Sequence, residues 1–435
     1  MVKKGVGIVV GMVFLFCMVA PAFSADKFNL SGEWRAWFIT DNDKDRDSDT
    51  EDDEAYVNQR LRLGINFNPN ENVMSRLTVD YGEGTWGKSN YDWNGWNTAD
   101  EDTETEVVHA FVGLNKGIFS AKVGQFWNGT ANYILWDQIG RGVQIDLALP
   151  VTIKLNYTKA NEGGTRLDTP VPDDPATPAV DESLVGEDID FYGLNLGYSS
   201  GAFGVNLTAA TRQDNSDADV SPWAVGLQIT TKLGPLGVNF EVDQFGGSHG
   251  TKDVVGTQAY LDLSAAPAKA IKCGLRAVYA TGTDNRTDEI QYHSIQAGAE
   301  SFQPFGIEGA MMYWPYAAAY PFGTNTWAEG SGPSGDFAGV FDPAGVSAGS
   351  IGFSPYISYA AVDALTIYGK VAYAKPQEDT NTNLDSKLAV MVNADYVIFG
   401  NTTLSAGYIY SKPEFDDDTP NDPRQTLVAQ LKVTF

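Results

Sequence analysis

Apolar and polar residues alternate with a period of two along many segments of this chain. Near its end, Leu427 and Leu431 share one face of an extended segment, and Gln430 and Lys432 share the other. The same period runs through three further segments, at 151–158, 203–210 and 236–243. Since side chains alternate between the two faces of a β-strand, the pattern predicts strands with one apolar and one polar face.

Short and long connections follow one another between these segments. The short ones are rich in Gly, Pro and Asn, as at Leu149-Pro150, Gly234-Pro235 and Gln303-Pro304, and these residues suit tight turns. The long ones are polar, as at 161–188 and 314–349. The arrangement predicts antiparallel hairpins. The most even division gives roughly twenty strands, and the range is about 16 to 20 if some pairs lie inside loops.

The polar face of the predicted strands carries charges that a dry core would not hold. Arg60, Arg62, Lys154, Glu241 and Asp243 all fall on it. A soluble β-sandwich or β-helix would have to bury such side chains at a high cost. In a closed barrel that crosses a membrane, the apolar face meets lipid and the polar face meets water. The sequence therefore predicts an all-β protein, a closed antiparallel transmembrane β-barrel.

The beginning of the chain has the pattern of a secretory signal peptide. Lys3 and Lys4 precede the apolar run Val6–Ala20, and small residues follow at 21–25. We expect a signal peptide at residues 1–24 and a single transmembrane barrel domain at residues 25–435. No later stretch reaches the roughly 18 to 20 consecutive apolar residues that a membrane helix needs.

Charge and rare residue types argue against several classes of function. The formal net charge of -27 makes nucleic acid an improbable partner. The chain has only 3 histidines and 2 cysteines, which is little material for a metal or acid–base site. The acidic run 41–54 lacks the Gly and Glu spacing of an EF-hand and is interpreted as a solvated loop. We expect no cofactor and no metal site.

Basic residues dominate the face that the alternation assigns to the lumen. The predicted pore-lining residues are Arg60, Arg62, Arg76, Lys122, Lys154, Arg212, Glu241, Asp243 and Arg276. The acidic residues gather in loops such as 39–55 instead. Because charge at the mouth is screened by salt, while charge in the bore acts at close range, we expect weak ion selectivity, with the mouth favouring cations and the wall binding anions.

Residues 104–149 resemble the general porins of Gram-negative bacteria. The segments His109–Leu114 and Gly117–Gln125 are similar to the paired strands before the third loop of that family, and Gly140–Gln144 is similar to the strand that follows it. The aromatic last residue, Phe435, is similar to the family's ending. The chain departs from the family in having only Asp137, and no arginine, in the segment that corresponds to the third loop.

The resemblance implies a bacterial outer-membrane location, with short periplasmic turns and long extracellular loops, and a homotrimer. It also implies that the third loop, Phe126–Ile139, folds into the barrel and narrows it; the candidate constriction residues are Trp127, Tyr133, Trp136 and Asp137. The expected partners are outer-membrane lipid, lipopolysaccharide and small hydrophilic solutes. The aromatic residues expected at the membrane interfaces are Trp34, Trp37, Tyr157, Tyr192, Tyr198, Trp223, Tyr279, Tyr373 and Tyr408.

We therefore expect a porin that forms a water-filled channel for passive diffusion of small hydrophilic solutes and ions, and not an enzyme. The first alternative is a substrate-selective channel for oligosaccharides or an acidic polysaccharide. A barrel hydrolase would need a nucleophile beside a histidine, yet His293 and Ser294 are sequence neighbours and would face opposite ways on a strand. A structural or adhesive barrel would show no single-channel conductance.

Overall fold

The computed structural model describes most of the chain. It covers residues 27–42, 54–85, 105–129, 132, 134–161, 189–214, 220–285, 287–295, 305, 309, 341, 348–379, 383–417 and 421–435. The predicted signal peptide, residues 1–24, lies outside these ranges. Within them, no helix has both the length and the apolar character needed to cross a membrane.

The described residues form one 19-stranded sheet. Its strands are β1 (Phe28–Asn42), β2 (Glu54–Asn70), β3 (Val73–Thr85), β4 (Thr105–Lys116), β5 (Phe119–Gly129), β6 (Asp137–Leu147), β7 (Thr152–Asn161), β8 (Ile189–Ser200), β9 (Phe203–Asp214), β10 (Val220–Leu233), β11 (Leu236–His249), β12 (Lys252–Ala268), β13 (Ile271–Ala280), β14 (Glu289–Gln291), β15 (Ser350–Val362), β16 (Leu365–Lys375), β17 (Leu384–Phe399), β18 (Thr402–Phe415) and β19 (Arg424–Thr434).

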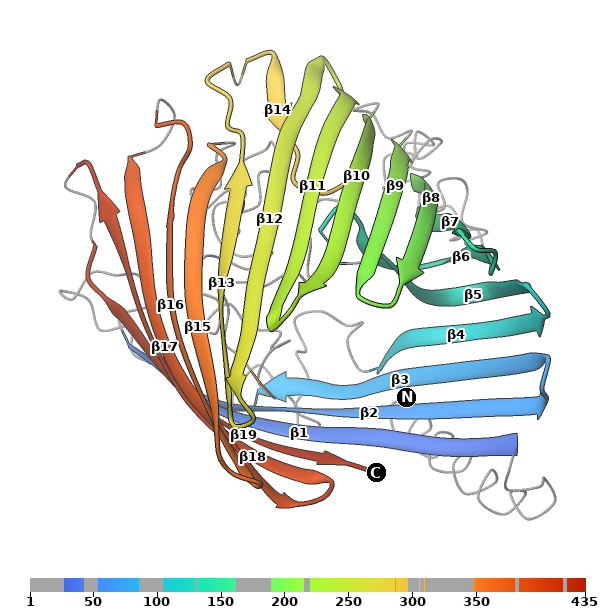
Figure 1. The fold of residues 1–435 in the computed structure, drawn as a ribbon, viewed down its shortest axis with the longest axis horizontal. Coiled ribbons are helices and arrows are strands. Elements are labelled where there is room, and N and C mark those ends of the chain that lie inside the picture. Colours follow the sequence, from blue (N-terminus) through green and yellow to red (C-terminus); the bar gives the residue numbers. More distant parts are fainter. Residues whose placement is uncertain are drawn as a thin grey trace, which may run out of the picture.

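The sheet closes on itself, because β1 pairs with β2 on one side and with β19 on the other. The first and last strands therefore lie side by side (Figure 1). At the seam, the Gly32 amide donates to the Phe435 carbonyl at 2.7 Å, and the Phe435 amide donates back at 2.9 Å. The Phe435 ring lies over Gly32 and leaves no room for a Cβ there. Closure removes the free edges that lipid could not hydrogen-bond.

The barrel wall has 18 antiparallel strands, which confirms the predicted fold class and its range of strand number. The division into roughly twenty strands was too high by one pair. The predicted turn at Gln303-Pro304 lies outside the described residues, and no strand pair is inserted at that point, because β13 pairs directly with β15 from Ile271↔Tyr359 to Ala280↔Ser350. The short β14 instead pairs in parallel with β12, from Asp253↔Glu289 to Val255↔Gln291.

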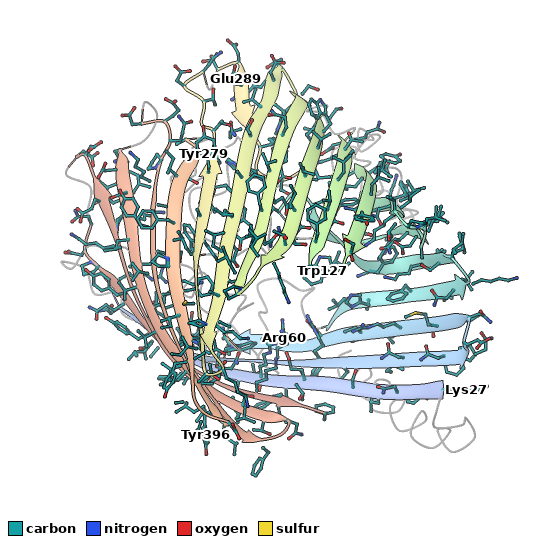
Figure 2. The ribbon with its side chains drawn as sticks, in the orientation of Figure 1. Lys27, Arg60, Trp127, Tyr279, Glu289 and Tyr396 are labelled. Atoms are coloured by element: carbon teal, nitrogen blue, oxygen red, sulfur yellow. The ribbon has the colours of Figure 1, made fainter. Side chains whose placement is uncertain are left out.

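The two faces of the wall differ as the alternation predicts. Leu207 and Val123 are 49% and 55% exposed on the outer face, whereas Glu241 and Asp243 on the inner face are 3% and 1% exposed. Figure 2 shows Arg60 pointing into the space that the strands enclose and Tyr396 pointing away from it. The outer surface is therefore an apolar belt, which suits lipid, around a lumen with many polar side chains.

One predicted interfacial aromatic residue lies on the wrong face. Trp37 is fully buried, and its Nε1 donates to Gln430 Oε1 at 2.8 Å across the barrel seam. It shares its face with the lumenal Arg35, two positions earlier, so it cannot share the outer face with Trp34. The prediction for Trp37 was wrong because it weighed residue type above strand register.

Candidate functional site in the barrel lumen

Cations surround two carboxylates on the inner wall where the barrel closes. We call this the basic cluster; it consists of Arg35, Arg60, Arg62 and Lys432 around Glu33 and Asp80. Glu33, on β1, receives a hydrogen bond from Arg35 Nη2 at 2.8 Å. Lys432 Nζ, on the adjoining β19, lies 3.0 Å from the same carboxylate oxygen, Oε2. Cross-strand neighbours on one face thus bring opposite charges together.

Asp80, on β3, is the second centre of the basic cluster. Arg62 on β2 binds it in bidentate fashion, with Nε 2.5 Å from Oδ1 and Nη2 2.5 Å from Oδ2. Arg60 lies between the two carboxylates, with Nη1 3.8 Å from Asp80 and Nη2 3.7 Å from Glu33 Oε1. Because the cluster contains more guanidinium and ammonium groups than carboxylates, it presents a surplus of positive charge to the lumen.

The next strands of the inner wall also carry cations, and one of these cations lies close to aromatic rings. Lys122 Nζ, on β5, lies 5.7 Å from the centre of the Phe111 ring and 6.0 Å from that of Phe126, within the range of cation–π attraction. Arg76 Nε, on β3, donates to Thr78 Oγ1 at 3.1 Å. Lys154, on β7, stands opposite Asp146 of β6 in the strand register.

The opposite part of the wall carries two buried carboxylates, which we call the acid pair, Glu241 and Asp243 on β11. Their hydrogen-bond partners among the described residues are amides: Asn132 Nδ2 donates to Glu241 at 2.5 Å, and Gln258 Nε2 donates to Asp243 at 3.1 Å. Asp243 Oδ1 has no hydrogen-bond partner among the described residues. Among the residues that the structure describes, the acid pair therefore has no cationic partners like those that compensate Glu33 and Asp80.

A segment between β5 and β6 enters the lumen and meets the acid pair. We call its described residues, 132 and 134–136, the inserted segment. Asn132 exchanges hydrogen bonds with Asn239 of β11 at 2.8 and 3.3 Å. Ile134 packs in an apolar cluster with Trp37 and Tyr260, while Leu135 and Trp136 pack in a second one with Phe191 and Phe245. Because these partners come from distant strands, the segment lies within the barrel.

A second inward-facing stretch holds the inserted segment in place. Ser294 Oγ donates to the Leu135 carbonyl at 3.2 Å, and the Ile295 amide donates to the same oxygen at 3.1 Å. The Trp136 ring stacks on Phe191, with ring centres 6.0 Å apart and planes inclined by 18°. The hydroxyl of Ser294 thus serves a structural contact, and His293 beside it stacks on Phe341 at 6.2 Å.

The structure describes three of the four candidate constriction residues, and only one of them lies in the inserted segment. Trp136 belongs to the inserted segment and is 1% exposed. Trp127 lies in β5 on the outer face instead, 38% exposed, and Asp137 is the first residue of β6, opposite Gly129. Tyr133 lies outside the described residues. The connection is shorter than the segment predicted from the resemblance, because β5 and β6 pair as far as Gly129↔Asp137.

The remaining predicted pore-lining residues stand in local ion pairs on the inner wall. Arg212 pairs with Asp214 on the same strand and lies 5.9 Å from the Phe191 ring centre. Arg276 Nε lies 3.4 Å from Asp262 Oδ2, and the Asp262 carboxylate also accepts a hydrogen bond from Tyr356 at 2.9 Å. The structure thus brings Arg60 and Arg62 together, sets Glu241 beside Asp243, and leaves Arg212 and Arg276 in separate pairs.

Sequence reasoning missed three residues that organise the lumen. Glu33 and Arg35 alternate with Trp34 and Ala36, so the period of two could have placed them on the inner face. Asn132 gave no such signal, because its role depends on a contact with β11, more than a hundred positions away. In the described part of the chain, no three His, Cys, Asp or Glu side chains gather as a metal site would need.

The fold is similar to that of several solved porins. A BenF-like porin from Pseudomonas fluorescens has a TM-score of 0.54 at 11% identity, over 94% of this chain and 99% of the porin. OprD from Pseudomonas aeruginosa has a TM-score of 0.55 at 11% identity, over 94% and 95% of the two chains. OccK9 (OpdG) from the same species reaches 0.57 at 12% identity, over 94% and 99%. No protein-family model and no curated protein sequence matches this chain.

At sequence identities this low, the comparisons show a similar fold and say nothing about which solute is transported. The closed barrel and its apolar belt define a membrane-spanning β-barrel with a lumen. More particularly, the fold is that of a Gram-negative outer-membrane porin, and the protein is located in the bacterial outer membrane. Barrels of 16 to 18 strands in this class generally enclose an aqueous channel.

Proposed function

We propose that the protein is an outer-membrane channel through which small hydrophilic solutes and ions diffuse passively. The observation that carries this proposal is the basic cluster on the inner wall of a barrel whose outer wall is apolar. Charged groups in that number favour a hydrated lumen, because their desolvation would be costly. The inserted segment would narrow the path between the basic cluster and the acid pair.

Conductance across a planar lipid bilayer tests this proposal directly. We expect single-channel steps whose current rises in proportion to salt concentration. We also expect a small reversal potential in a salt gradient, since the acidic loop residues and the basic cluster favour ions of opposite sign. Polymers of graded size added to both chambers would measure the radius of the narrowest point. Reconstituted protein that gives no steps would refute a channel and favour a structural or adhesive barrel.

A second candidate function is a substrate-selective channel for an anionic oligosaccharide or acidic polysaccharide. The surplus of cations in the basic cluster favours it, because guanidinium groups bind carboxylates in bidentate fashion. Such a channel would show ion current that an acidic oligosaccharide blocks at a saturable site, whereas passive diffusion would leave the current proportional to concentration. Arg60→Gln should then relieve the block.

We also propose a homotrimer, on the strength of the resemblance to general porins alone. Light scattering of the detergent-solubilised protein would give the mass of the protein part. A mass equal to that of one chain would refute the trimer and would not affect the proposal of a channel.

A further inference from the structure

A groove on the outer wall interrupts the apolar belt across β7 to β10. Its volume is ≈ 480 Å³. Tyr192 on β8 and Trp223 on β10 form its sides, 41% and 45% exposed, and small residues between them, Gly193 and Ala209, form its floor. Its polar lining is slight, so the groove suits a hydrocarbon chain better than water.

Above this groove, on the side of the long loops, polar side chains follow one another across five strands. We call them the polar row; it consists of Gln125, Arg141, Lys159, Asp190 and Gln213, paired in register across β5, β6, β7, β8 and β9. The row lies two positions beyond Tyr157 and Tyr192, whose rings are 5.4 Å apart. Along the wall, apolar residues are followed by tyrosines and then by charged residues. This order matches a membrane, in which acyl chains are followed by an interface and then by headgroups.

The charges of the polar row leave one cation available. Arg141 is exposed and forms no hydrogen bond or ion pair with any residue that the structure describes. Lys159 Nζ lies 3.5 Å from Asp190 Oδ1, and the same carboxylate oxygen accepts a hydrogen bond from Tyr157 at 2.9 Å. Among its own five side chains, the row has two cations and one carboxylate, on a chain whose net charge is -27.

We propose that this surface binds a phosphorylated glycolipid of the outer leaflet. One acyl chain lies in the groove between Tyr192 and Trp223, and a phosphate lies against Arg141, with Lys159 beside it. A guanidinium group suits phosphate because its N–H donors match two phosphate oxygens. Neighbouring strands are only about 4.8 Å apart, so one headgroup can reach both cations while its chain descends into the groove. The exposed amide of Gln213 is available to a sugar hydroxyl.

The full-length protein in dodecyl maltoside micelles allows a direct test by native mass spectrometry. The probe is hexa-acylated, bisphosphorylated lipid A. The comparison probes are the same lipid A without phosphates and phosphatidylglycerol, which carries a phosphate but no sugar. We expect the phosphorylated lipid A to bind more tightly than either comparison probe.

Three variants separate the two halves of the surface. Arg141→Gln with Lys159→Gln should weaken binding of the phosphorylated probe roughly tenfold and leave binding of the dephosphorylated probe unchanged. Ala209→Phe fills the groove from its floor and should weaken binding of both. Lys375→Gln, which removes an exposed cation at the loop end of β16, is the matched control and should change neither.

Equal binding of phosphatidylglycerol and phosphorylated lipid A would overturn the assignment to a glycolipid. Unchanged affinity in the double variant, or an equal loss in Lys375→Gln, would overturn the site itself. If the double variant does not fold, as judged by thermal unfolding in detergent, Arg141→Gln alone is tested against the same criteria. Single-channel conductance is expected to be the same in all variants, so a failure of this site is distinct from a failure of the channel.

Discussion

The basic cluster and the acid pair both hold two carboxylates on the inner wall, but the side chains that bind these carboxylates differ. Glu33 and Asp80 are each within ion-pair distance of at least two cations. Glu241 and Asp243 are more deeply buried and are held by the amides of Asn132 and Gln258. An amide offers a hydrogen bond without a charge, so no cation among the described residues balances the acid pair.

The difference indicates separate roles for the two regions. In the basic cluster, ion pairs fix the carboxylates and orient the arginines, and the surplus charge is left to act on a passing solute. In the acid pair, Glu241 accepts a hydrogen bond from Asn132 of the inserted segment, and Asp243 accepts one from Gln258 of β12, so the carboxylates hold parts of the chain itself. Under the proposed function, we therefore expect the basic cluster to influence which ions enter and the acid pair, through the inserted segment, to influence the width of the path.

The largest effect is expected from a third carboxylate beside the acid pair. Leu135→Asp would place one in the apolar cluster of the inserted segment, next to Phe245. An uncompensated buried charge costs on the order of 3 to 5 kcal/mol, which the segment avoids by leaving the lumen. Single-channel conductance should rise, and larger polymers should enter the pore.

Leu135→Met is the matched control, because it keeps an apolar side chain of similar volume. Its conductance should equal that of the native protein. A Leu135→Asp channel with native conductance would show that the inserted segment does not define the narrowest point.

Neutralising one carboxylate in each region should change stability in opposite directions. Asp80→Asn removes the charge that Arg62 binds in bidentate fashion and that Arg60 approaches, and should lower the free energy of unfolding by about 1 to 3 kcal/mol. Asp243→Asn relieves the repulsion from Glu241 and should raise it by about 1 kcal/mol. Urea unfolding in lipid vesicles, followed by tryptophan fluorescence, would measure both changes.

The same pair of variants tests the comparison between the regions. Equal destabilisation by Asp80→Asn and Asp243→Asn would mean that the acid pair is compensated after all. Asp262→Asn provides a reference for a carboxylate with a single arginine partner, Arg276, and should fall between the two.

A smaller effect is expected where the acid pair meets the inserted segment. Asn132→Ala removes the hydrogen bonds to Glu241 and Asn239, a loss of about 1 to 2 kcal/mol in how firmly the segment is held. The open-channel current should become noisier, while its mean changes little. Asn195→Ala removes a lumenal asparagine whose amide donates to Thr208 at 2.8 Å and not to the residues that hold the segment, and it should leave the noise unchanged. Equal noise in both variants would contradict this anchoring role.

The faces of the wall could be predicted from the sequence because they depend only on local alternation. In β11, Glu241 and Asp243 point inward since their neighbours Phe240 and Val242 must meet lipid. A period of two fixes every second side chain once one of them is assigned. The same rule would have placed Trp37 inside, had register been given more weight than residue type.

The interior could not be predicted because its contacts join distant parts of the chain. Ile134 packs with Trp37, and Leu135 is held by Ser294, contacts for which no periodic signal exists. The count of roughly twenty strands was one pair too high for the same reason, since the pairing of β13 with β15 omits a long stretch of sequence between them. The alternation of residues shows which face of a strand points into the lumen, whereas the segments that enter the lumen are determined by contacts between distant residues.

The smallest effect is expected from a cation outside any ion pair. Arg76 hydrogen-bonds to Thr78 and forms no ion pair with a described residue, so Arg76→Gln removes one positive charge from the basic side of the lumen. The reversal potential in a salt gradient should shift toward cations by on the order of a few millivolts, because the charge acts through screened, hydrated space. Replacing a whole ion pair, with Arg212→Gln and Asp214→Asn together, leaves the net charge unchanged and should not shift it. A shift of equal size in both would mean that pore shape, and not wall charge, sets the ion preference.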